Sequence, residues 1–118
     1  MEFKNLEIWN IAVDLTETIY ILTKKFPKEE IYGLISQMRR CSLSIPSNIA
    51  EGKGRRTTKD FIQFLYIAKG SLNELQTQVI ISKRLNFITE DEYNELEKTF
   101  TKLKNKLVNF ISHLSKSN

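Results

Sequence analysis

The chain has 118 residues, of which 41% are hydrophobic and 27% charged, with four glycines, two prolines and a formal net charge of +4. This length fits one domain, residues 1–118, that is large enough to bury a core, and so little glycine and proline disfavours a loop-rich or all-β fold. No apolar run approaches the ~20 residues that cross a bilayer, and the N-terminus lacks the order of a signal peptide. A single cysteine, Cys41, cannot form an internal disulfide. We therefore expect a cytoplasmic protein without a membrane partner.

Four segments carry apolar residues spaced alternately by three and four positions, which is typical of helices buried along one side. The first has Ile8, Ala12, Leu15, Ile19, Leu22 and Phe26; the second has Ile31, Ile35, Met38, Ser42, Ile45 and Ile49; the third has Phe61, Leu65, Ala68, Leu72, Leu75 and Val79; the fourth has Tyr93, Leu96, Phe100, Leu103, Leu107, Phe110 and Leu114. Only Ser42 is polar among them.

Residues between these segments predict where the helices begin and end. Pro27 suits the first turn of the second helix, where a missing N–H costs nothing, and Gly52 and Gly54 are placed to end it. The later helices have N-terminal caps of familiar type, namely Thr57 with Asp60 and a capping box of Thr89 and Glu92 flanked by Ile88 and Tyr93.

The predicted connections near 26–28, 53–57 and 86–89 are only a few residues long, so neighbouring helices must run antiparallel. The expected fold is all-α, an up-down-up-down antiparallel four-helix bundle. Helices of about 25–30 residues make it ~40 Å long.

Two of the helices carry a second apolar stripe beside the first, made of Trp9, Val13, Tyr20, Phe64, Tyr66, Ile67, Ile80 and Ile81. One interpretation is a wide core face, which is common in globular helices. The other is a contiguous exposed patch where subunits or another protein bind. A slim bundle has little interior room for this many aromatic rings, which favours self-association.

Pro46 interrupts the second helix. It has no N–H and crowds the carbonyl of Ser42 four residues earlier, so we expect a kink or a break there. In one interpretation Ser44, Asn48 and Glu51 form a local hydrogen-bond network that stabilises the kink. In the other, the kink exposes these polar groups as a binding site. Glu51 can also pair with Arg55 one turn later.

Residues 39–59 contain six cations and a single acid, Glu51. The cations are Arg39, Arg40, Lys53, Arg55, Arg56 and Lys59. The sequence GKGRRTTK has the wrong spacing for a Walker motif and follows no strand, so a nucleotide site is disfavoured. A solvated turn between helices and a patch that binds a nucleic-acid backbone remain open. Repetition of these cations around an oligomer favours nucleic-acid binding, because the patches of all subunits then form a ring of positive charge.

Residues typical of catalysis or metal binding are scarce. His113 is the only histidine and no Glu-x-x-His pair occurs, so a bundle metal site is not predicted. Cys41 flanks a core stripe and is expected to be a buried thiol. The acids at 90–97 suit the start of a helix. We predict no metal, no cofactor and no enzymatic activity.

Three stretches together resemble a known family: FPKEEIYGLISQMRRCSLSIPSNIAEGKGR at 26–55, FKNLEIW near the N-terminus with Ala12, and DFIQFLYIAKGSLNEL at 60–75. They are similar to the proteins encoded in intervening sequences of bacterial 23S ribosomal RNA genes. Cys41 stands where such sequences more often carry alanine. The resemblance covers roughly residues 3–90, and the fourth helix agrees by pattern.

The resemblance implies a four-helix bundle that assembles as a ring-shaped homopentamer. It also implies a likeness in fold to the accessory variability determinant protein of diversity-generating retroelements, a basic pentameric barrel that binds nucleic acid and a reverse transcriptase. The family's biochemical role is not established. By this likeness the arginines and lysines at 39–56 become candidate nucleic-acid contacts. The family's structural signature falls on Ser44, Pro46, Asn48, Glu51 and Gly52.

Two functions follow as hypotheses. The first is a homo-oligomer that binds RNA or DNA backbone through residues 39–59. The second is a scaffold or adaptor that binds another protein through the second apolar stripe and has no nucleic-acid role.

Overall fold

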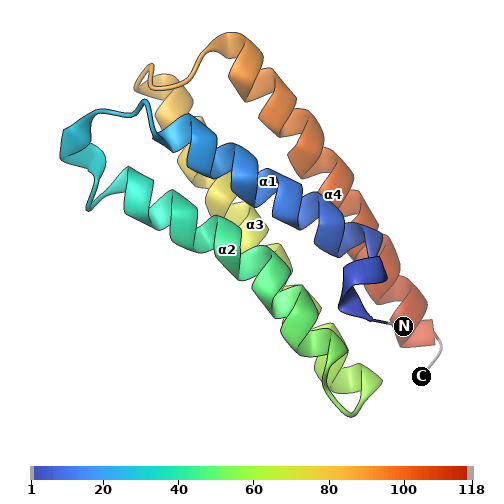
Figure 1. The fold of residues 1–118 in the computed structure, drawn as a ribbon. Helices are drawn as coiled ribbons and strands as arrows, with labels where there is room; N and C mark the ends of the chain where they lie inside the picture. The colour runs from blue at the N-terminus through green and yellow to red at the C-terminus, as the bar shows by residue number, and fades with distance from the viewer. Residues whose placement is uncertain (1, 117–118) are drawn as a thin grey trace.

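The computed structural model describes residues 2–116, and this part of the chain contains helices and turns but no strand. The helices are α1 (Glu7–Thr23), α2 (Leu34–Lys53), α3 (Thr58–Arg84) and α4 (Glu90–Lys116), with short 3-10 helices η1 (Phe3–Asn5) and η2 (Lys28–Glu30). Successive helices run antiparallel and form an elongated molecule of 46 × 24 × 20 Å (Figure 1). The predicted four-helix fold is confirmed.

The core follows the predicted apolar stripes. Every stripe residue of α1 and α3 is buried. Near the end of α4 the buried position is Ile111 rather than Phe110, because Phe110 turns toward α3 and meets the ring of Phe61 edge-on, with 5.7 Å between ring centroids. Of the second stripe, Trp9, Val13, Tyr20, Phe64 and Ile80 are half-buried and Tyr66, Ile67 and Ile81 are exposed.

The connection between α1 and α2 corrects the prediction. It runs over residues 24–33 rather than 26–28, and Pro27 precedes η2 instead of starting α2. Ile31, expected in the core, is 55% exposed. The carboxylate of Glu30 accepts a hydrogen bond from the Leu34 N–H at 3.3 Å, so α2 begins only there. The first two helices are therefore shorter than expected, with 17 and 20 residues against 27 in each of the other two.

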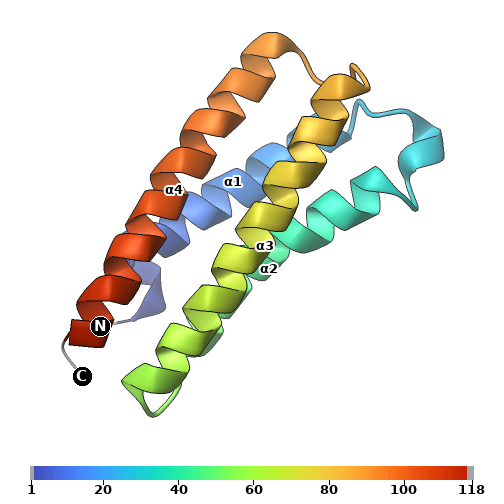
Figure 2. The same cartoon turned by 180° about the vertical axis from the view of Figure 1, so that it is seen from behind.

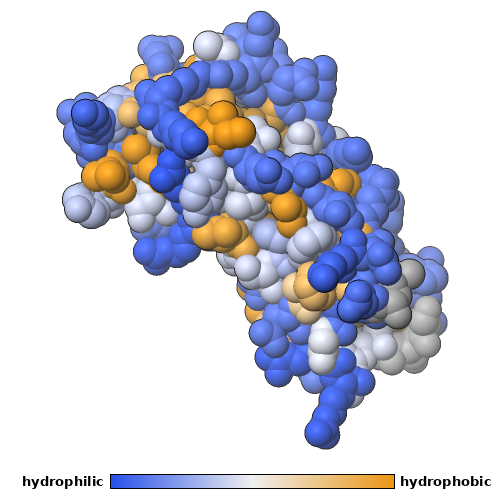
Figure 3. Space-filling model, viewed as in Figure 1, coloured by the Kyte–Doolittle hydropathy of each residue, from blue (hydrophilic) through white to orange (hydrophobic). Residues whose placement is uncertain are grey.

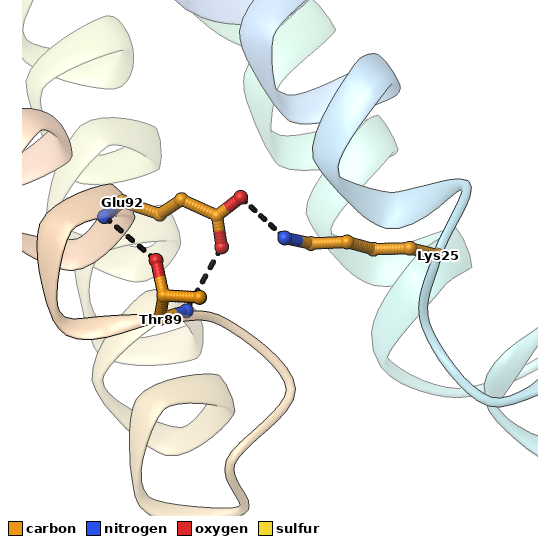
Figure 4. A network of polar contacts seen from close by, with 3 residues as sticks. All are labelled: Lys25, Thr89 and Glu92. Atoms are coloured by element: carbon orange, nitrogen blue, oxygen red, sulfur yellow. Dashed lines mark hydrogen bonds and ion pairs between the residues drawn. The ribbon is translucent and has the colours of Figure 1, made fainter.

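The later helix starts agree with their predicted caps. The Thr57 hydroxyl accepts from the Asp60 N–H at 3.1 Å. In the capping box, Glu92 N–H donates to the Thr89 hydroxyl at 3.1 Å and Thr89 N–H donates to the Glu92 carboxylate at 2.8 Å. The Lys25 ammonium, at the end of α1, pairs with the same carboxylate (Figure 4). Lys25 and the Thr89 N–H lower the pKa of Glu92 below its ordinary value.

The α2 helix continues through Pro46 without a break. The Ser42 carbonyl, which has no N–H partner at position 46, lies 2.9 Å from the hydroxyl of Thr16 on α1. Both residues are buried. The same hydroxyl also lies 2.9 Å from the Ala12 carbonyl of its own helix. That carbonyl has a backbone N–H donor within α1, whereas the Ser42 carbonyl has lost its own to Pro46, so the hydroxyl of another helix takes the place of the missing backbone donor.

Gly52 lets α2 and α3 approach closely at the end of the bundle. A Cβ atom added there would lie 2.6 Å from the Phe64 Cβ and 2.9 Å from the Phe61 ring. No side chain fits at that distance, so the two helices can meet this closely only at glycine. Gly54 then ends α2, with its N–H bonded to the carbonyls of Ala50 and Glu51. Within residues 2–116, no helix combines the length and apolarity needed to cross a bilayer.

Candidate nucleic-acid interface

The connection between α2 and α3 places four cations at one end of the bundle. They are Lys53, Arg55, Arg56 and Lys59, and we call them the basic turn. The turn lies at the narrow end of the molecule, beyond the close contact at Gly52 (Figure 2). This tight turn leaves little backbone between the cations, so their charges are concentrated in a small volume.

Two of these cations are held by the surface beneath them. The Arg55 guanidinium pairs with Glu51 at 3.0 Å and lies over the Phe64 ring, 4.7 Å from its centroid. The Lys53 ammonium lies 5.9 Å from the centroid of Phe61. The contacts with the two rings orient the cations without neutralising them. Among the described residues, only the charge of Arg55 is also balanced, by Glu51.

The other two cations of the basic turn are unpaired within the described part of the chain. Arg56 and Lys59 are exposed and form no ion pair with residues 2–116. Asp60, the nearest further acid, lies in the first turn of α3, where its N–H donates to the Thr57 cap, and its side chain is exposed. The basic turn therefore carries a net positive charge that faces water, which is what an approaching phosphate requires.

A shallow hollow of about 260 Å³ adjoins the basic turn and is lined by Lys59, Ile62, Gln63, Tyr66 and Ser115. Tyr66 is 53% exposed, so much of its side chain remains open to a ligand. Bases of a single strand stack on exposed aromatic rings, and a cation beside the ring attracts the phosphate backbone. Tyr66 and Lys59 provide these two groups.

Arg39 and Arg40 do not belong to this surface, which corrects the predicted patch over 39–59. They lie 14 and 13 residues before Lys53 on the same helix, about 20 Å away along its axis. Arg39 is half-buried: its Nε donates to the Thr23 hydroxyl at 2.9 Å, and its guanidinium lies 4.8 Å from the centroid of the Tyr20 ring. Arg39 therefore ties α2 to α1, while Arg40 is exposed and forms no ion pair with another described residue.

The polar signature residues on α2 form contacts within the fold. The Asn48 amide donates to the Ser44 carbonyl at 2.7 Å and to its hydroxyl at 2.9 Å, and the Ser44 and Ser71 hydroxyls are 2.9 Å apart. Glu51 pairs with Arg55 instead of joining this network. Of the two interpretations the structure favours the local network, extended by Ser71 from α3, which periodicity in the sequence does not reveal.

The two residues with reactive side chains lie apart. Cys41 is buried on α2, and burial raises the pKa of its thiol although the Gln78 amide donates to the sulfur at 3.4 Å. The Gln78 carbonyl oxygen is buried without a partner among the described residues; an amide turned by 180° would accept the thiol proton. His113 is exposed near the end of α4. In residues 2–116 no three His, Cys, Asp or Glu side chains gather as metal ligands do.

Comparison with known proteins decides the family. The family model described as "23S rRNA-intervening sequence protein" matches residues 4–109. The chain belongs to this family. The match includes the basic turn, the Pro46 segment and most of α4, so the pattern common to 23S rRNA-intervening sequence proteins spans both the bundle and the candidate interface.

One solved structure has the same fold as this member of the 23S rRNA-intervening sequence protein family. It is the crystal structure of a protein with unknown function from the S23 ribosomal protein family of Bacteroides thetaiotaomicron VPI-5482. The two chains are 24% identical, the match covers 89% of this chain and 95% of that chain, and the TM-score is 0.82. A search of curated proteins found no match.

Proposed function

We propose that the protein is a non-enzymatic homo-oligomer that binds the backbone of RNA or DNA through the basic turn. The observation that carries this proposal is the group of four cations on one tight turn, of which only Arg55 has an acidic partner among residues 2–116. Phosphates attract such a group in any sequence context, because the interaction releases counterions from the nucleic acid. Tyr66 beside Lys59 favours single strands, whose bases are free to stack.

Assembly strengthens this interaction. The proposed oligomer is the ring-shaped homopentamer implied by the sequence resemblance, and the exposed apolar residues Ile67 and Ile81 on α3 supply surface for subunit contacts. Five copies would bring five basic turns together on one particle, so that a single strand meets several of them at once. Light scattering tests this directly: the expected mass is five times the 13.8 kDa of one chain.

Fluorescence anisotropy with a single-stranded RNA of about 20 nucleotides tests nucleic-acid binding. Affinity is expected to fall steeply as salt rises from about 50 to 200 mM. Changing Arg56→Glu together with Lys59→Glu should abolish most binding and reduce the salt slope. Tyr66→Ala should weaken the binding of single-stranded RNA while leaving duplex DNA little changed, since stacking requires an unpaired base.

A matched control carries the same charge change at the opposite end of the bundle. Lys24→Glu with Lys28→Glu alters two exposed cations, one after α1 and one in η2, and should leave binding unchanged apart from a small effect of net charge. Equal losses in both double variants would mean that overall charge, rather than the basic turn, binds the RNA. Absence of binding at low salt would refute the proposal.

A further inference from the structure

A groove of about 490 Å³ runs between α1 and α4, on the side of the bundle away from the contact between α2 and α3. Its floor is formed by buried leucines of the two helices, Leu15, Leu22 and Leu96, together with half-buried Ile11. Figure 3 shows this face of the molecule, on which separate apolar spots lie among hydrophilic side chains.

Ion pairs lie at or near each end of this groove. Lys25 pairs with Glu92 at one end, and Lys106 pairs with Glu7 at 3.0 Å near the other. The first and last lining residues on each helix are 11 positions apart, which corresponds to a length of about 16 Å, or three helical turns. The groove is therefore a bounded slot of the length of a short helix rather than an open seam.

The walls of the groove are acidic. Asp14 on α1 faces Asp91, Glu92 and Glu95 on α4, with Lys102 as the single cation of the lining. Asp14 and Asp91 form no ion pair with another described residue, while Glu92 and Glu95 pair with Lys25 and Lys98. This surface repels phosphate, so it has the opposite preference to that of the basic turn.

We propose that the groove between α1 and α4 is a docking site for a cationic amphipathic helix of a partner protein. Apolar side chains spaced by three and four residues would enter the slot and contact its leucine floor. Lysines or arginines on both flanks of that helix would face Asp14 on one wall and Asp91 and Glu95 on the other. The apolar floor between two acidic walls is complementary to a helix with one apolar stripe and cations on both sides of it. An acidic or purely polar helix is not complementary to this groove.

A second copy of this chain is the alternative occupant. Subunits that met through the groove would occlude it in the assembled protein, and the free protein would then bind no added helix. The test therefore measures both peptide binding and molecular mass on the same samples.

The probe is a synthetic helical peptide of about 14 residues with leucine on one stripe and lysine on both flanks, titrated by calorimetry at about 150 mM salt. Two control peptides separate the contribution of the apolar spacing from that of charge. One has the same composition in shuffled order, and the other has glutamate in place of lysine. The amphipathic lysine peptide is expected to bind with one site per chain. The shuffled peptide should bind at least about tenfold more weakly, and the acidic peptide should not bind.

Variants then locate the site. Asp14→Arg with Glu95→Arg places like charges on both walls and should raise the Kd by at least about tenfold. The matched control, Glu17→Arg with Glu29→Arg, makes the same charge change at exposed positions outside the groove and should leave the Kd within about twofold. Three results would overturn the proposal: equal binding of shuffled and amphipathic peptides, equal effects of the two double variants, or a loss of oligomer mass in Asp14→Arg with Glu95→Arg. The RNA-binding measurements on the basic turn are independent of all three.

Discussion

Replacing Thr16 by valine tests the explanation for an uninterrupted helix at Pro46. Valine keeps the shape of threonine but removes the hydroxyl that lies 2.9 Å from the Ser42 carbonyl. Thr16 and Ser42 are both buried, so water cannot take over as the donor. The carbonyl then loses the interaction that replaces the missing N–H of Pro46.

The expected size of the effect follows from burial. A buried polar group without a partner costs about 1–3 kcal/mol. The methyl group that replaces the hydroxyl returns up to about 0.8 kcal/mol through its own burial. We expect Thr16→Val to lower the free energy of unfolding by about 1–2 kcal/mol.

Pro46→Ala makes the test specific. Alanine restores a backbone N–H that can donate to the Ser42 carbonyl, so the hydroxyl of Thr16 becomes dispensable for that group. In the Pro46→Ala background, Thr16→Val should cost about 1–2 kcal/mol less than it does in the natural chain. The double-mutant cycle cancels whatever packing Pro46→Ala itself removes.

Urea unfolding followed by circular dichroism measures all four proteins. The protein concentration must be the same throughout, because association adds to apparent stability. A loss of about 1–2 kcal/mol moves the midpoint by roughly 0.5–1 M urea. If Thr16→Val costs the same in both backgrounds within about 0.5 kcal/mol, the hydroxyl does not substitute for the missing N–H and this explanation fails.

Three further outcomes are expected. Gly52→Ala should destabilise the protein by about 1–3 kcal/mol in urea unfolding, because the added Cβ would meet α3. Gly70→Ala, which has open space around it, is the control and should stabilise the protein by up to about 1 kcal/mol. Equal effects of the two substitutions would contradict the close approach of α2 and α3 at Gly52. The pKa of Glu92 is lowered in the fold, so its stabilising contribution is present above pH 4.5 and is lost as the pH falls below that value; Glu92→Gln should unfold at lower urea at neutral pH and lose less stability on acidification, and parallel pH profiles would argue against this role. Burial raises the pKa of Cys41, so iodoacetamide should alkylate it slowly at pH 8 in the folded protein and at an ordinary thiol rate in urea, and fast alkylation of the folded protein would show that the thiol is accessible.

Periodicity predicts those parts of the fold that depend on burial alone. The stripe from Ile8 to Leu22 and that from Phe61 to Val79 are buried throughout, because each position lies on one face of a continuous helix. Phe26 is buried as well, although α1 ends at Thr23. Capping also predicts well, since Thr57 and Thr89 act on residues only three positions away. Contacts between residues so close in the sequence can be predicted from the sequence alone.

The errors arise where a contact joins distant residues or where spacing is ambiguous. Ile31 keeps the three-and-four spacing of α2, yet α2 begins only at Leu34, whose N–H donates to the Glu30 carboxylate, and Ile31 stays outside the helix. Thr16 bonds to a carbonyl 26 positions away, which no helical period indicates. A threonine beside the apolar stripe of α1 was the available signal.

The candidate site shows the same division. The cations at 53–59 could be predicted to lie together because they share one short turn. Arg39 could not be placed from the sequence, since its engagement with Thr23 and Tyr20 depends on how α2 packs against α1.

The ten-residue connection over 24–33 has a practical consequence for studying this protein. It lies at the opposite end of the bundle from the basic turn, whereas η1 and the end of α4 lie at the same end as that turn (Figure 1). A purification tag or fusion partner at either terminus would therefore crowd the surface where RNA is expected. Tyr32 is 93% exposed in the distant connection, so a cysteine introduced there would carry a fluorophore that reports binding without obstructing it.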